Sequence, residues 1–415
     1  MTHLWSVLSL SVLCSCATQV LSTIATETAT ATATECDVRS YGAVGDGVTL
    51  DDKAFASAFA ACQPSQGTVH VPRGEYLLSP FNMSSNSDLF LDDGAVLLAS
   101  TDFSLWPVVI NLPSYPDPEG LRYGAFIGGS DIHNVTIRGT GTIDGQGQAW
   151  WDGAANGELE YGRPRLIEPM YCTQFSLIGV TVLNPPFWAV HPYACDVVLI
   201  ENVNFSAPLN SPNTDGIDPD SCSNVIIRNL TATCGDDAVA IKSGKDEYGR
   251  QFNRPSYNIL VEGGNIGPSR GIDIGSEMSG DVYNVVVRNT RFHGSKFAGR
   301  IKSGRGRGGK VYNVTFEDLS FEQNEMGFAI TMHYSSEHPE PPMDESTPHV
   351  RDITFRRIQG SALTAGVIAC LPESPCHGIV FEDINITSKV GGLECIRAFG
   401  ETRGEVYPDS CLHEE

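Results

Sequence analysis

Acidic side chains gather in one short part of the chain. The stretch NTDGIDPD carries Asp215, Asp218 and Asp220, and one repeat later the stretch CGDD carries Asp236 and Asp237. Carboxyl groups held close together repel one another, so at least one should keep its proton at mildly acidic pH. A protonated carboxyl beside an ionised one suits general acid and base catalysis. The alternatives are solvated turn residues or a structural Ca²⁺ site.

Asp236 and Asp237 can serve one site only if the chain bends between them. Adjacent residues on a regular strand point to opposite faces. Gly235, which directly precedes them, permits a turn or bulge at this position. We therefore expect both carboxyl groups to face the same site.

Basic residues cluster further along, in the stretch KFAGRIKSGRGRGGK. Arg300 and Lys302 alternate with Ile301, so they should share one face of a strand and hold a carboxylate between them. The alternative for any one of these cations is a solvated surface charge. Carboxylates for chemistry beside cations for binding indicate an acidic polymer as substrate.

A repeating pattern must position these side chains. From about residue 132 the chain alternates short β-branched runs with turns of Asn, Asp or Gly, as in HNVTIRGTGTIDG and YNVVVRNTRFHG. Such units cannot bury a face alone but can stack on one another. Stacked coils lie roughly 4.8 Å apart, which would bring Asp215 beside Asp236 or Asp237. The sequence predicts an all-β fold, a parallel β-helix, over residues 36–413.

A helix is expected to cap the N-terminal end of the solenoid. The segment 50–62, LDDKAFASAFAAC, places apolar residues on one helical stripe and acidic residues near its start. The glycine-rich stretch YGAVGDG precedes it as a turn. An open end of stacked strands needs such a cover against edge pairing.

The pattern of the N-terminal residues predicts a secretion signal. Residues 1–17 contain an apolar run too short to span a bilayer, followed by small residues, and are predicted as a signal peptide. The alternative is a buried strand. Residues 18–35 form a Thr/Ala-rich linker, and no later segment is predicted to span a membrane.

Cysteines and glycosylation signals agree with secretion. Beyond the predicted signal peptide the number of cysteines is even, which suits disulfides, and Cys370 with Cys376 and Cys395 with Cys411 are the preferred pairs. N-glycosylation sequons begin at Asn82, Asn134, Asn204, Asn229, Asn313 and Asn385. We expect a secreted glycoprotein of a eukaryotic cell.

Composition excludes other classes. A formal net charge of -23 disfavours nucleic-acid binding through a basic surface. With 41% hydrophobic and 19% charged residues, the chain can build a large core and is not expected to be disordered. We expect a monomer with no nucleic-acid or membrane partner.

The ordered motifs resemble a known family. NTD at 213–215, GDD at 235–237, GSEMSG at 275–280 and RIK at 300–302 are together similar to the polygalacturonase family, glycoside hydrolase family 28. The resemblance covers roughly residues 36–411 and is strongest to the plant and bacterial branch that contains exopolygalacturonases. The segments 41–62 and 184–195 also match that branch.

The resemblance implies a right-handed, single-stranded parallel β-helix of the pectin-lyase-like kind. It implies hydrolysis of α-1,4-galacturonosidic bonds of pectin with inversion, by an extracellular or cell-wall enzyme without metal or cofactor. Asp236 matches the general acid, and Asp215 and Asp237 match the pair that activates water. Arg300 and Lys302 match the cations that hold the galacturonate carboxylate. An inverting pair should lie roughly 6.5 to 9.5 Å apart.

Other residues of the implied binding site are less regular. Asn213 belongs to the matched motif, and His191 is expected near the cleft, more as a buried, hydrogen-bonded histidine than as a ligand. Arg270 stands where many members carry His, and Asp273 where Ser is common. Arg270 would act as a further carboxylate clamp or pair with Asp273. Both departures put fast endo-cleavage of plain polygalacturonate in doubt.

The sequence leaves three alternative functions open. A lyase would use Ca²⁺ held by carboxylates such as Asp215, Asp218 and Asp220. A catalytically weak homologue would bind pectin only, and a hydrolase of substituted pectin, such as rhamnogalacturonan or xylogalacturonan, would share fold and chemistry. The branch resemblance favours exo action, with segments 111–122 and 333–347 as candidates to close one end of the cleft.

Overall fold

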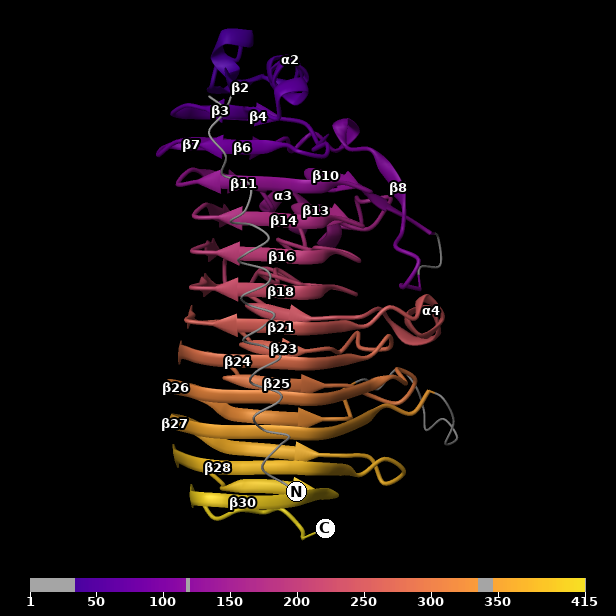
Figure 1. The fold of residues 1–415 in the computed structure, drawn as a ribbon, viewed down its shortest axis with the longest axis vertical. Helices are drawn as coiled ribbons and strands as arrows, with labels where there is room; N and C mark the ends of the chain where they lie inside the picture. Colours follow the sequence, from indigo (N-terminus) through magenta and orange to yellow (C-terminus); the bar gives the residue numbers. More distant parts are fainter. Residues whose placement is uncertain (1–33, 117–119, 335–345, 415) are drawn as a thin grey trace.

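Short parallel strands stack in register along the described chain. The computed structural model describes residues 34–116, 120–334 and 346–414. Figure 1 shows the coils stacked along the longest axis, from the indigo N-terminal end to the yellow C-terminal end. Strand pairs along the solenoid are parallel, which confirms the predicted right-handed parallel β-helix. The predicted signal peptide (1–17) and nearly all of the linker (18–35) lie outside the described residues.

The strands fall into columns, one strand per coil. The first column contains β1 (Glu35–Asp37), β3 (Thr68–Val71), β6 (Asp88–Leu91), β11 (His133–Gly139), β14 (Thr173–Ile178), β16 (Asp196–Glu201), β18 (Ser223–Arg228), β21 (Ser256–Glu262), β24 (Val282–His293), β26 (Lys310–Thr331), β27 (His349–Ala369), β28 (Cys376–Ser388) and β30 (Ala398–Tyr407). The second contains β2 (Asp46–Leu50), β4 (Gly74–Leu78), β7 (Ala95–Ala99), β12 (Thr142–Asp144), β15 (Thr181–Leu183), β17 (Asn204–Ser206), β19 (Thr231–Thr233) and β22 (Asn265–Ile266).

A third column carries the residues of chemical interest. It contains β5 (Phe81–Asn82), β10 (Ile127–Ser130), β13 (Ile167–Met170), β20 (Val239–Ile241), β23 (Ile272–Ile274), β25 (Gly299–Lys302) and β29 (Leu393–Ile396). Single bridges at Val190 and Ile217 continue it between β13 and β20. From β24 onward the long strands bend through more than one column.

Alternation fills the interior and builds the corners. In β21, Ile259 and Val261 are buried and stack in register on residues of the neighbouring coils. Near the start of three strands of the first column, Asn258, Asn284 and Asn313 each adopt a left-handed backbone, with φ of 53 to 55°. Each donates its Nδ2 to the Asn one coil earlier, at 2.6 to 3.2 Å. These asparagines therefore form a hydrogen-bonded ladder that runs from coil to coil.

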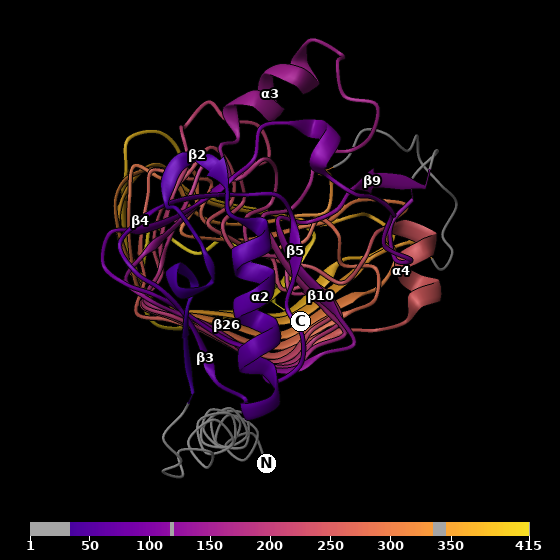
Figure 2. The same cartoon turned by 90° about the horizontal axis from the view of Figure 1, so that it is seen from above.

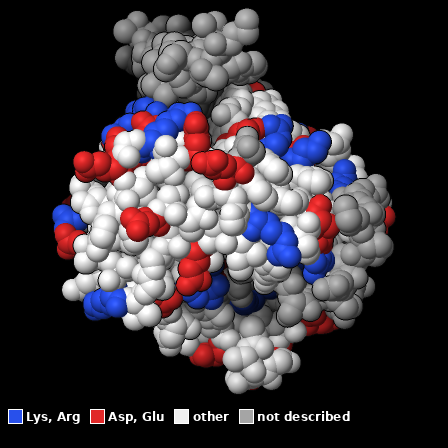
Figure 3. Space-filling model, turned by 90° about the horizontal axis from the view of Figure 1, so that it is seen from below, with Lys and Arg blue, Asp and Glu red and all other residues white. Residues whose placement is uncertain are grey.

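Charges alternate from coil to coil on the other side of the first column, toward the C-terminal ends of its shorter strands. In-register pairing places opposite signs on successive coils, and we call this set the charge ladder: Glu201, Arg228, Glu262, Arg288, Glu317, Arg356, Glu382 and Arg403. Arg228 donates to Glu262 at 2.9 Å and to Glu201 at 3.2 Å. In Figure 3, which views the molecule from below, acidic and basic side chains are likewise interspersed.

Both ends of the solenoid are covered. Helix α2 (Asp52–Cys62) lies across the N-terminal end in Figure 2, with Phe55 and Ala58 buried against the first coils, as predicted. Its N-cap residue Asp51 accepts backbone N–H groups of Val44 and Gly45 at 2.7 and 3.0 Å, which fixes the glycine-rich turn. At the other end, residue His413 bridges to Phe399 of β30.

The disulfides lie near these ends. Cys36–Cys62 ties α2 to β1, and the predicted pairs Cys370–Cys376 and Cys395–Cys411 are confirmed. The expectation that the even number of cysteines forms disulfides throughout is wrong for the other four. These are buried free thiols: Cys172, Cys195, Cys222 and Cys234. Cys172, Cys195 and Cys222 occupy successive coils, where Sγ atoms accept backbone N–H groups of the coil before, as Cys195 does from Cys172 at 3.4 Å.

Helices and a hairpin interrupt the coils outside the strand columns. Helices α3 (Gln148–Ala155) and α4 (Asp246–Phe252) were not expected from the sequence, nor were the short 3₁₀ turns 38–41, 63–65 and 103–105. Strands β8 (Val108–Ile110) and β9 (Leu121–Tyr123) form an antiparallel hairpin. Figures 1 and 2 place this hairpin and α4 on the same side of the solenoid. Among the described residues, no helix is long and apolar enough to cross a membrane.

Candidate active site

The outer face of the third column carries a row of charged side chains. One isoleucine per coil points into the core: Ile217, Ile241, Ile274 and Ile301. The residues directly before and after each of them in its strand therefore face outward. Parallel register then places Asp273 beside Arg300, and Lys242 beside Asp220. The strand period alone thus lines up acids and bases from coils that are far apart in sequence.

Three carboxyl groups, those of Asp215, Asp236 and Asp237, meet at the edge of this row, and we call them the carboxylate cluster. One oxygen from each of Asp215, Asp236 and Asp237 lies within 4.8 Å of the others, so the predicted convergence of these side chains is found. The chain bends at Gly235, where an added Cβ would lie 2.3 Å from the carbonyl oxygen of Ser211. Only glycine fits this approach, and the bend lets Asp236 and Asp237 face one site.

The oxygens are closer than the roughly 6.5 to 9.5 Å expected between the carboxyl groups of an inverting pair. The reason is the stacking itself. Asp215 and Asp237 belong to neighbouring coils joined by the Ile217–Val239 bridge, and Asp236 is adjacent to Asp237 in the chain. Spacing by itself therefore does not indicate inversion.

Burial and neighbouring charge separate the three carboxyl groups. Burial and the repulsion of Asp237 raise the pKa of Asp236, against the opposing charges of Arg270 and Lys302. Burial and the charge of Asp218 raise the pKa of Asp215 well above its usual range. Burial also opposes ionisation of Asp237, but Lys302 and Arg300 outweigh it and lower its pKa. Asp236 therefore keeps its proton to a higher pH than Asp237, which lies beside it.

The predicted cations converge on the same place but hold carboxylates of the chain. Arg300 donates from Nε to Asp273 at 2.9 Å and also through Nη2. Lys302 donates to Asp237 and lies 3.1 Å from Asp273. Arg270 lies 3.4 Å from Asp236. The alternative in which Arg270 pairs with Asp273 is wrong, because Asp273 is turned toward Arg300 and Lys302.

Lys242 is a central residue that the sequence reasoning missed. Its Nζ lies 3.2 Å from Glu277, 3.5 Å from Asp218 and 3.7 Å from Asp215. It also lies 4.3 Å from the ring centroid of Trp188. The alternation around Ile241 in AIKSG could have placed it on the outer face. Lys242 thus places positive charge beside Asp215, as Lys302 does beside Asp237.

One exposed aromatic ring also lies beside the cations. Tyr334 is 40% exposed, and its ring centroid lies 5.4 Å from Nζ of Lys302 and 5.7 Å from the guanidinium carbon of Arg300. It falls in the segment 333–347 singled out from the sequence, of which residues 335–345 lie outside the described chain. An exposed ring beside cations is a surface on which a sugar can stack.

The β8–β9 hairpin covers the next coils of the outer face. Tyr115, in its connecting loop, donates its hydroxyl to Asp220, and its neighbour Ser114 has its Oγ 2.8 Å from Oη of Tyr193. The backbone N–H of Lys245 donates to the carbonyl of Ser114 at 2.8 Å. Tyr193 and Asp220 are fully buried beneath these contacts. The loop is therefore fastened to coils on both sides of Asp215.

His191 and Asn213 take different places. His191 is fully buried, with Nδ1 3.0 Å from Glu168 and Nε2 3.4 Å from Asp220, so it lies below the hairpin as part of a buried network. Asn213 is exposed at the edge of the carboxylate cluster. Its Oδ1 accepts a hydrogen bond from Arg163 at 2.7 Å, and its backbone is left-handed, with φ of 55°.

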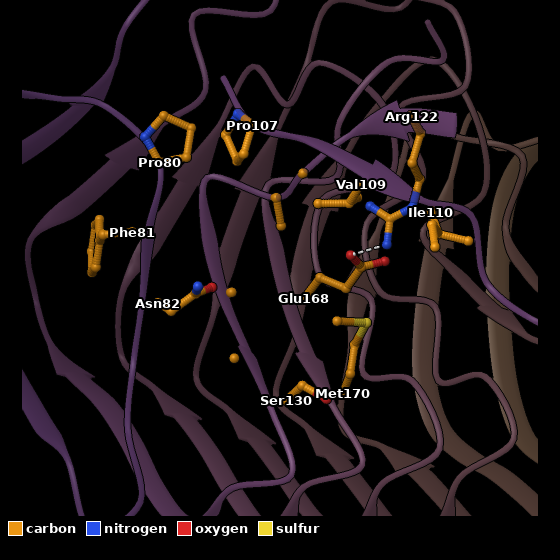
Figure 4. Close-up of a pocket in the computed structure, with 14 residues that line it drawn as sticks. Pro80, Phe81, Asn82, Pro107, Val109, Ile110, Arg122, Ser130, Glu168 and Met170 are labelled. Carbon is orange, nitrogen blue, oxygen red and sulfur yellow. Dashed lines mark hydrogen bonds and ion pairs between the residues drawn. The ribbon is translucent and has the colours of Figure 1, made fainter. Parts of the chain in front are cut away.

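A separate cavity of about 270 Å³ lies toward the N-terminal end of the same face. Figure 4 shows Arg122 reaching from β9 toward Glu168, to which it donates at 2.6 Å. The rest of the lining is mostly apolar, including Phe81, Ile110 and Met170. The three carboxyl groups do not line this cavity, so we do not assign the chemistry to it.

The carboxylate cluster is also the one place, among the described residues, where three acidic or metal-ligating side chains converge as a cation would require. The Ca²⁺ set of the lyase alternative is not brought together. Asp220 is turned to Tyr115 and His191, and Asp218 faces Lys242. Lys242, Arg300 and Lys302 already place positive charge around the cluster.

Comparisons with known proteins identify a family. Residues 62–398 match the model of glycosyl hydrolases family 28. A "Probable polygalacturonase" of Vitis vinifera is 38% identical over 357 residues, which cover 83% of this chain and 73% of that protein. An exopolygalacturonase of Zea mays is 28% identical and covers 91% of this chain and 90% of its own length.

Solved structures give the same result. A hyperthermoactive exopolygalacturonase from Thermotoga maritima superposes with a TM-score of 0.74 at 27% identity, over 90% of this chain and 92% of that one. A polygalacturonase from Erwinia carotovora also gives 0.74, at 25% identity, over 90% and 99%. With the stacked coils and converging carboxyl groups described above, these matches establish that the chain belongs to glycosyl hydrolase family 28.

Proposed function

We propose that the protein is a secreted, exo-acting hydrolase of the α-1,4-galacturonosidic bonds of pectin and polygalacturonate. One observation carries the proposal: a carboxyl group with a raised pKa, Asp236, lies beside a carboxylate with a lowered pKa, Asp237, next to cations. A donor and an acceptor of protons are thus available at the same mildly acidic pH.

The proposed roles follow from the order of these pKa values. Asp236 donates its proton to the glycosidic oxygen as the bond to the anomeric carbon breaks. Asp237, supported by Asp215, removes a proton from the attacking water, so one water is consumed per bond. We propose inversion at the anomeric carbon. Proton NMR of the first product tests it, since an initial β-anomer supports inversion and an initial α-anomer contradicts it.

Substrate binding is assigned to the exposed edge and the cations. Arg300 and Lys302 hold a galacturonate carboxylate, Arg270 offers a further cation on a side chain that is 43% exposed, and Asn213 lies at the rim. His191 supports the face from below. An Arg300→Ala variant should mainly raise KM for uronic-acid substrates. An equal effect on neutral sugars would contradict a carboxylate clamp.

The hairpin supports exo action. Glu168, Tyr193 and Asp220, which face outward on the coils leading up to the carboxylate cluster, are at most 1% exposed. Coils covered in this way leave less room for a polymer to extend along the face in that direction, which supports the proposed exo action. Relatives named exopolygalacturonases, from Zea mays and Thermotoga maritima, are consistent with this mode.

Secretion remains part of the proposal. The three disulfides suit an oxidising compartment, and the predicted signal peptide would direct the chain there. Mass spectrometry of protein from the culture medium of a eukaryotic host would give the mature N-terminus and any glycan on the six sequons. An N-terminus at Met1 would contradict the predicted signal peptide.

The decisive experiment incubates the purified protein with polygalacturonic acid at mildly acidic pH without Ca²⁺ and sizes the products over time. Saturated monogalacturonate from the outset supports exo-hydrolysis, and mixed oligomers indicate endo-cleavage. Products that absorb ultraviolet light indicate a lyase. No product on this polymer, with turnover of rhamnogalacturonan or xylogalacturonan, would favour the substituted-pectin hydrolase. Binding without turnover of any pectin would favour the catalytically weak homologue.

A further inference from the structure

A carboxyl group of the chain itself occupies the proposed substrate clamp. Asp273 is fully buried, and its Oδ2 accepts from two nitrogens of Arg300 while lying 3.1 Å from Nζ of Lys302. Its other oxygen, Oδ1, is buried without a hydrogen-bond partner. Asp273 therefore stands where the carboxylate of a bound uronic acid would have to reach Arg300 and Lys302.

The charge of Asp273 is balanced between opposing neighbours. The charged groups that face it are Asp237 on the preceding coil, and Arg300 and Lys302 on β25. Burial and the repulsion of Asp237 raise its pKa to about 6, against the two cations. The orphaned Oδ1 adds to the cost of the ionised form, since no donor solvates it. Asp273 thus changes charge between mildly acidic and neutral pH.

Each charge state leaves a different binding site. When Asp273 is neutral, Arg300 and Lys302 have unbalanced positive charge that a uronate can satisfy. When it is ionised, its negative charge satisfies the cations and repels a second carboxylate at the same guanidinium. Arg300 and Lys302 are only 5% and 4% exposed, so solvent does little to screen this competition.

We propose that Asp273 is a specificity-determining residue that couples substrate charge to pH. When Asp273 is neutral, Arg300 and Lys302 bind the carboxylate of a free uronate. When Asp273 is ionised, it keeps both cations as its own partners, and the site favours an uncharged ring, such as a methyl-esterified galacturonate. The proposal rests on the proposed function, because it concerns the substrate of that site.

The test compares two substrates in one enzyme. Trigalacturonate and its methyl-esterified counterpart are hydrolysed from about pH 5 to about pH 7, and the ratio of their kcat/KM values is measured. The uronate carboxyl stays ionised throughout, since such groups titrate near 3.5. Effects of pH on the chemical step cancel in the ratio. In the wild type the ratio of free to esterified substrate should fall at least about tenfold as pH rises, because the fraction of enzyme with neutral Asp273 falls by about that factor.

The isosteric Asp273→Asn variant should give a ratio that changes less than about twofold over this range, since its side chain does not titrate. Asp318→Asn removes an acid that pairs with Arg357 on the distant end of the first column and should behave as wild type. A flat ratio in the wild type, or the same fall in Asp273→Asn, overturns the proposal.

A binding measurement keeps the proposal testable if the variant does not fold. The dissociation constant of free galacturonate for the wild type, measured by titration calorimetry, should rise about tenfold over the same pH range. A constant affinity contradicts the role of Asp273. Failure of the proposed function would look different, as neither trisaccharide would be hydrolysed at any pH.

Discussion

The charge ladder and the carboxylate cluster are made by the same geometry with opposite results. In both, parallel register stacks one charged residue on another in successive coils. In the ladder every neighbour has the opposite sign, and Arg288 and Arg228 outweigh burial to lower the pKa of Glu262. In the cluster, carboxyl groups are adjacent and buried, so the pKa values of Asp215 and Asp236 are raised. The order of signs along the coils decides which outcome results.

The comparison separates stability from function. Apart from the buried Glu317, the ladder side chains are partly exposed, so most of these ion pairs contribute modestly. The cluster holds unlike and like charges out of water, which costs folding free energy but separates the pKa values of its carboxyl groups, as the proposed chemistry requires. We expect substitutions in the two regions to act on different observables.

The largest effect is expected from Asp236→Asn, which removes the proton donor without changing shape. Turnover of polygalacturonate should fall roughly 10²- to 10⁴-fold, while the thermal midpoint and substrate binding are retained. Steady-state kinetics and circular dichroism check both. Glu262→Gln is the matched control in the ladder and should keep wild-type kcat. Near-normal turnover by Asp236→Asn would remove Asp236 from the mechanism.

A smaller effect, on stability, is expected from Asp218→Asn. Asp218 is fully buried, neither of its oxygens has a hydrogen-bond partner, and burial raises its pKa to about 7 against the charge of Lys242. Because the folded pKa lies above the usual value of 3.8, the wild type loses stability as pH rises from about 4 to about 7. The variant lacks this loss and should gain roughly 1–3 kcal/mol in free energy of unfolding near pH 8.

Urea denaturation of the Asp218→Asn variant near pH 4 and pH 8 measures this gain, which should nearly vanish at the lower pH. Asp318→Asn provides a control of opposite sign. The hydrogen bond from Arg357 lowers the pKa of Asp318, so that variant should lose stability at the higher pH. Equal gains for Asp218→Asn at both pH values would contradict the buried-carboxylate explanation.

Breaking the ladder should cost less. Glu262→Gln leaves Arg228 and Arg288 without their shared carboxylate and should lower the free energy of unfolding by about 1 kcal/mol at neutral pH. Because the pKa of Glu262 is lowered, its contribution is present above the usual value of 4.5 and is lost as pH falls through the folded value. Thermal scans at neutral and strongly acidic pH should show the difference shrinking. A difference that persists in acid would point to packing.

The smallest effect is that of salt. Added NaCl screens partly exposed charges, so the difference in unfolding free energy between wild type and Glu262→Gln should shrink by about 0.5 kcal/mol or less in molar salt. The difference between wild type and Asp218→Asn near pH 8 should change less, because that carboxyl is buried. Denaturation at low and high salt measures both. Equal salt sensitivity would mean that the two regions are screened alike.

The sequence predicted what local pattern and stacking determine. β-branched runs between Asn and Gly turns gave the solenoid, and the stacking of coils brought Asp215 to Asp236 and Asp237. The capping helix followed from its apolar stripe. These features need only the strand period and one neighbouring coil.

The rest depended on register across loops of uneven length. Lys242 has an ordinary context in sequence, and Asp273 was noted only as a departure from the family; their places in the site appear only when Asp220 pairs with Lys242 and Arg300 with Asp273. The alternation of Arg and Glu at strand ends, as in VIIRN, LVEGG and VVVRN, was visible but had no meaning without that register. The hairpin contact of Tyr115 with Asp220 spans 105 residues and leaves no local signal.

The placement of the disulfides has a mechanical consequence. A solenoid frays from its ends, because a terminal coil has a neighbour on one side only. Among the described residues, the three covalent cross-links join segments at or near those ends, while the middle coils contain only thiols. Reduction of these disulfides would let the coils unfold from the two ends inward, and the catalytic coils, near the middle, would unfold last.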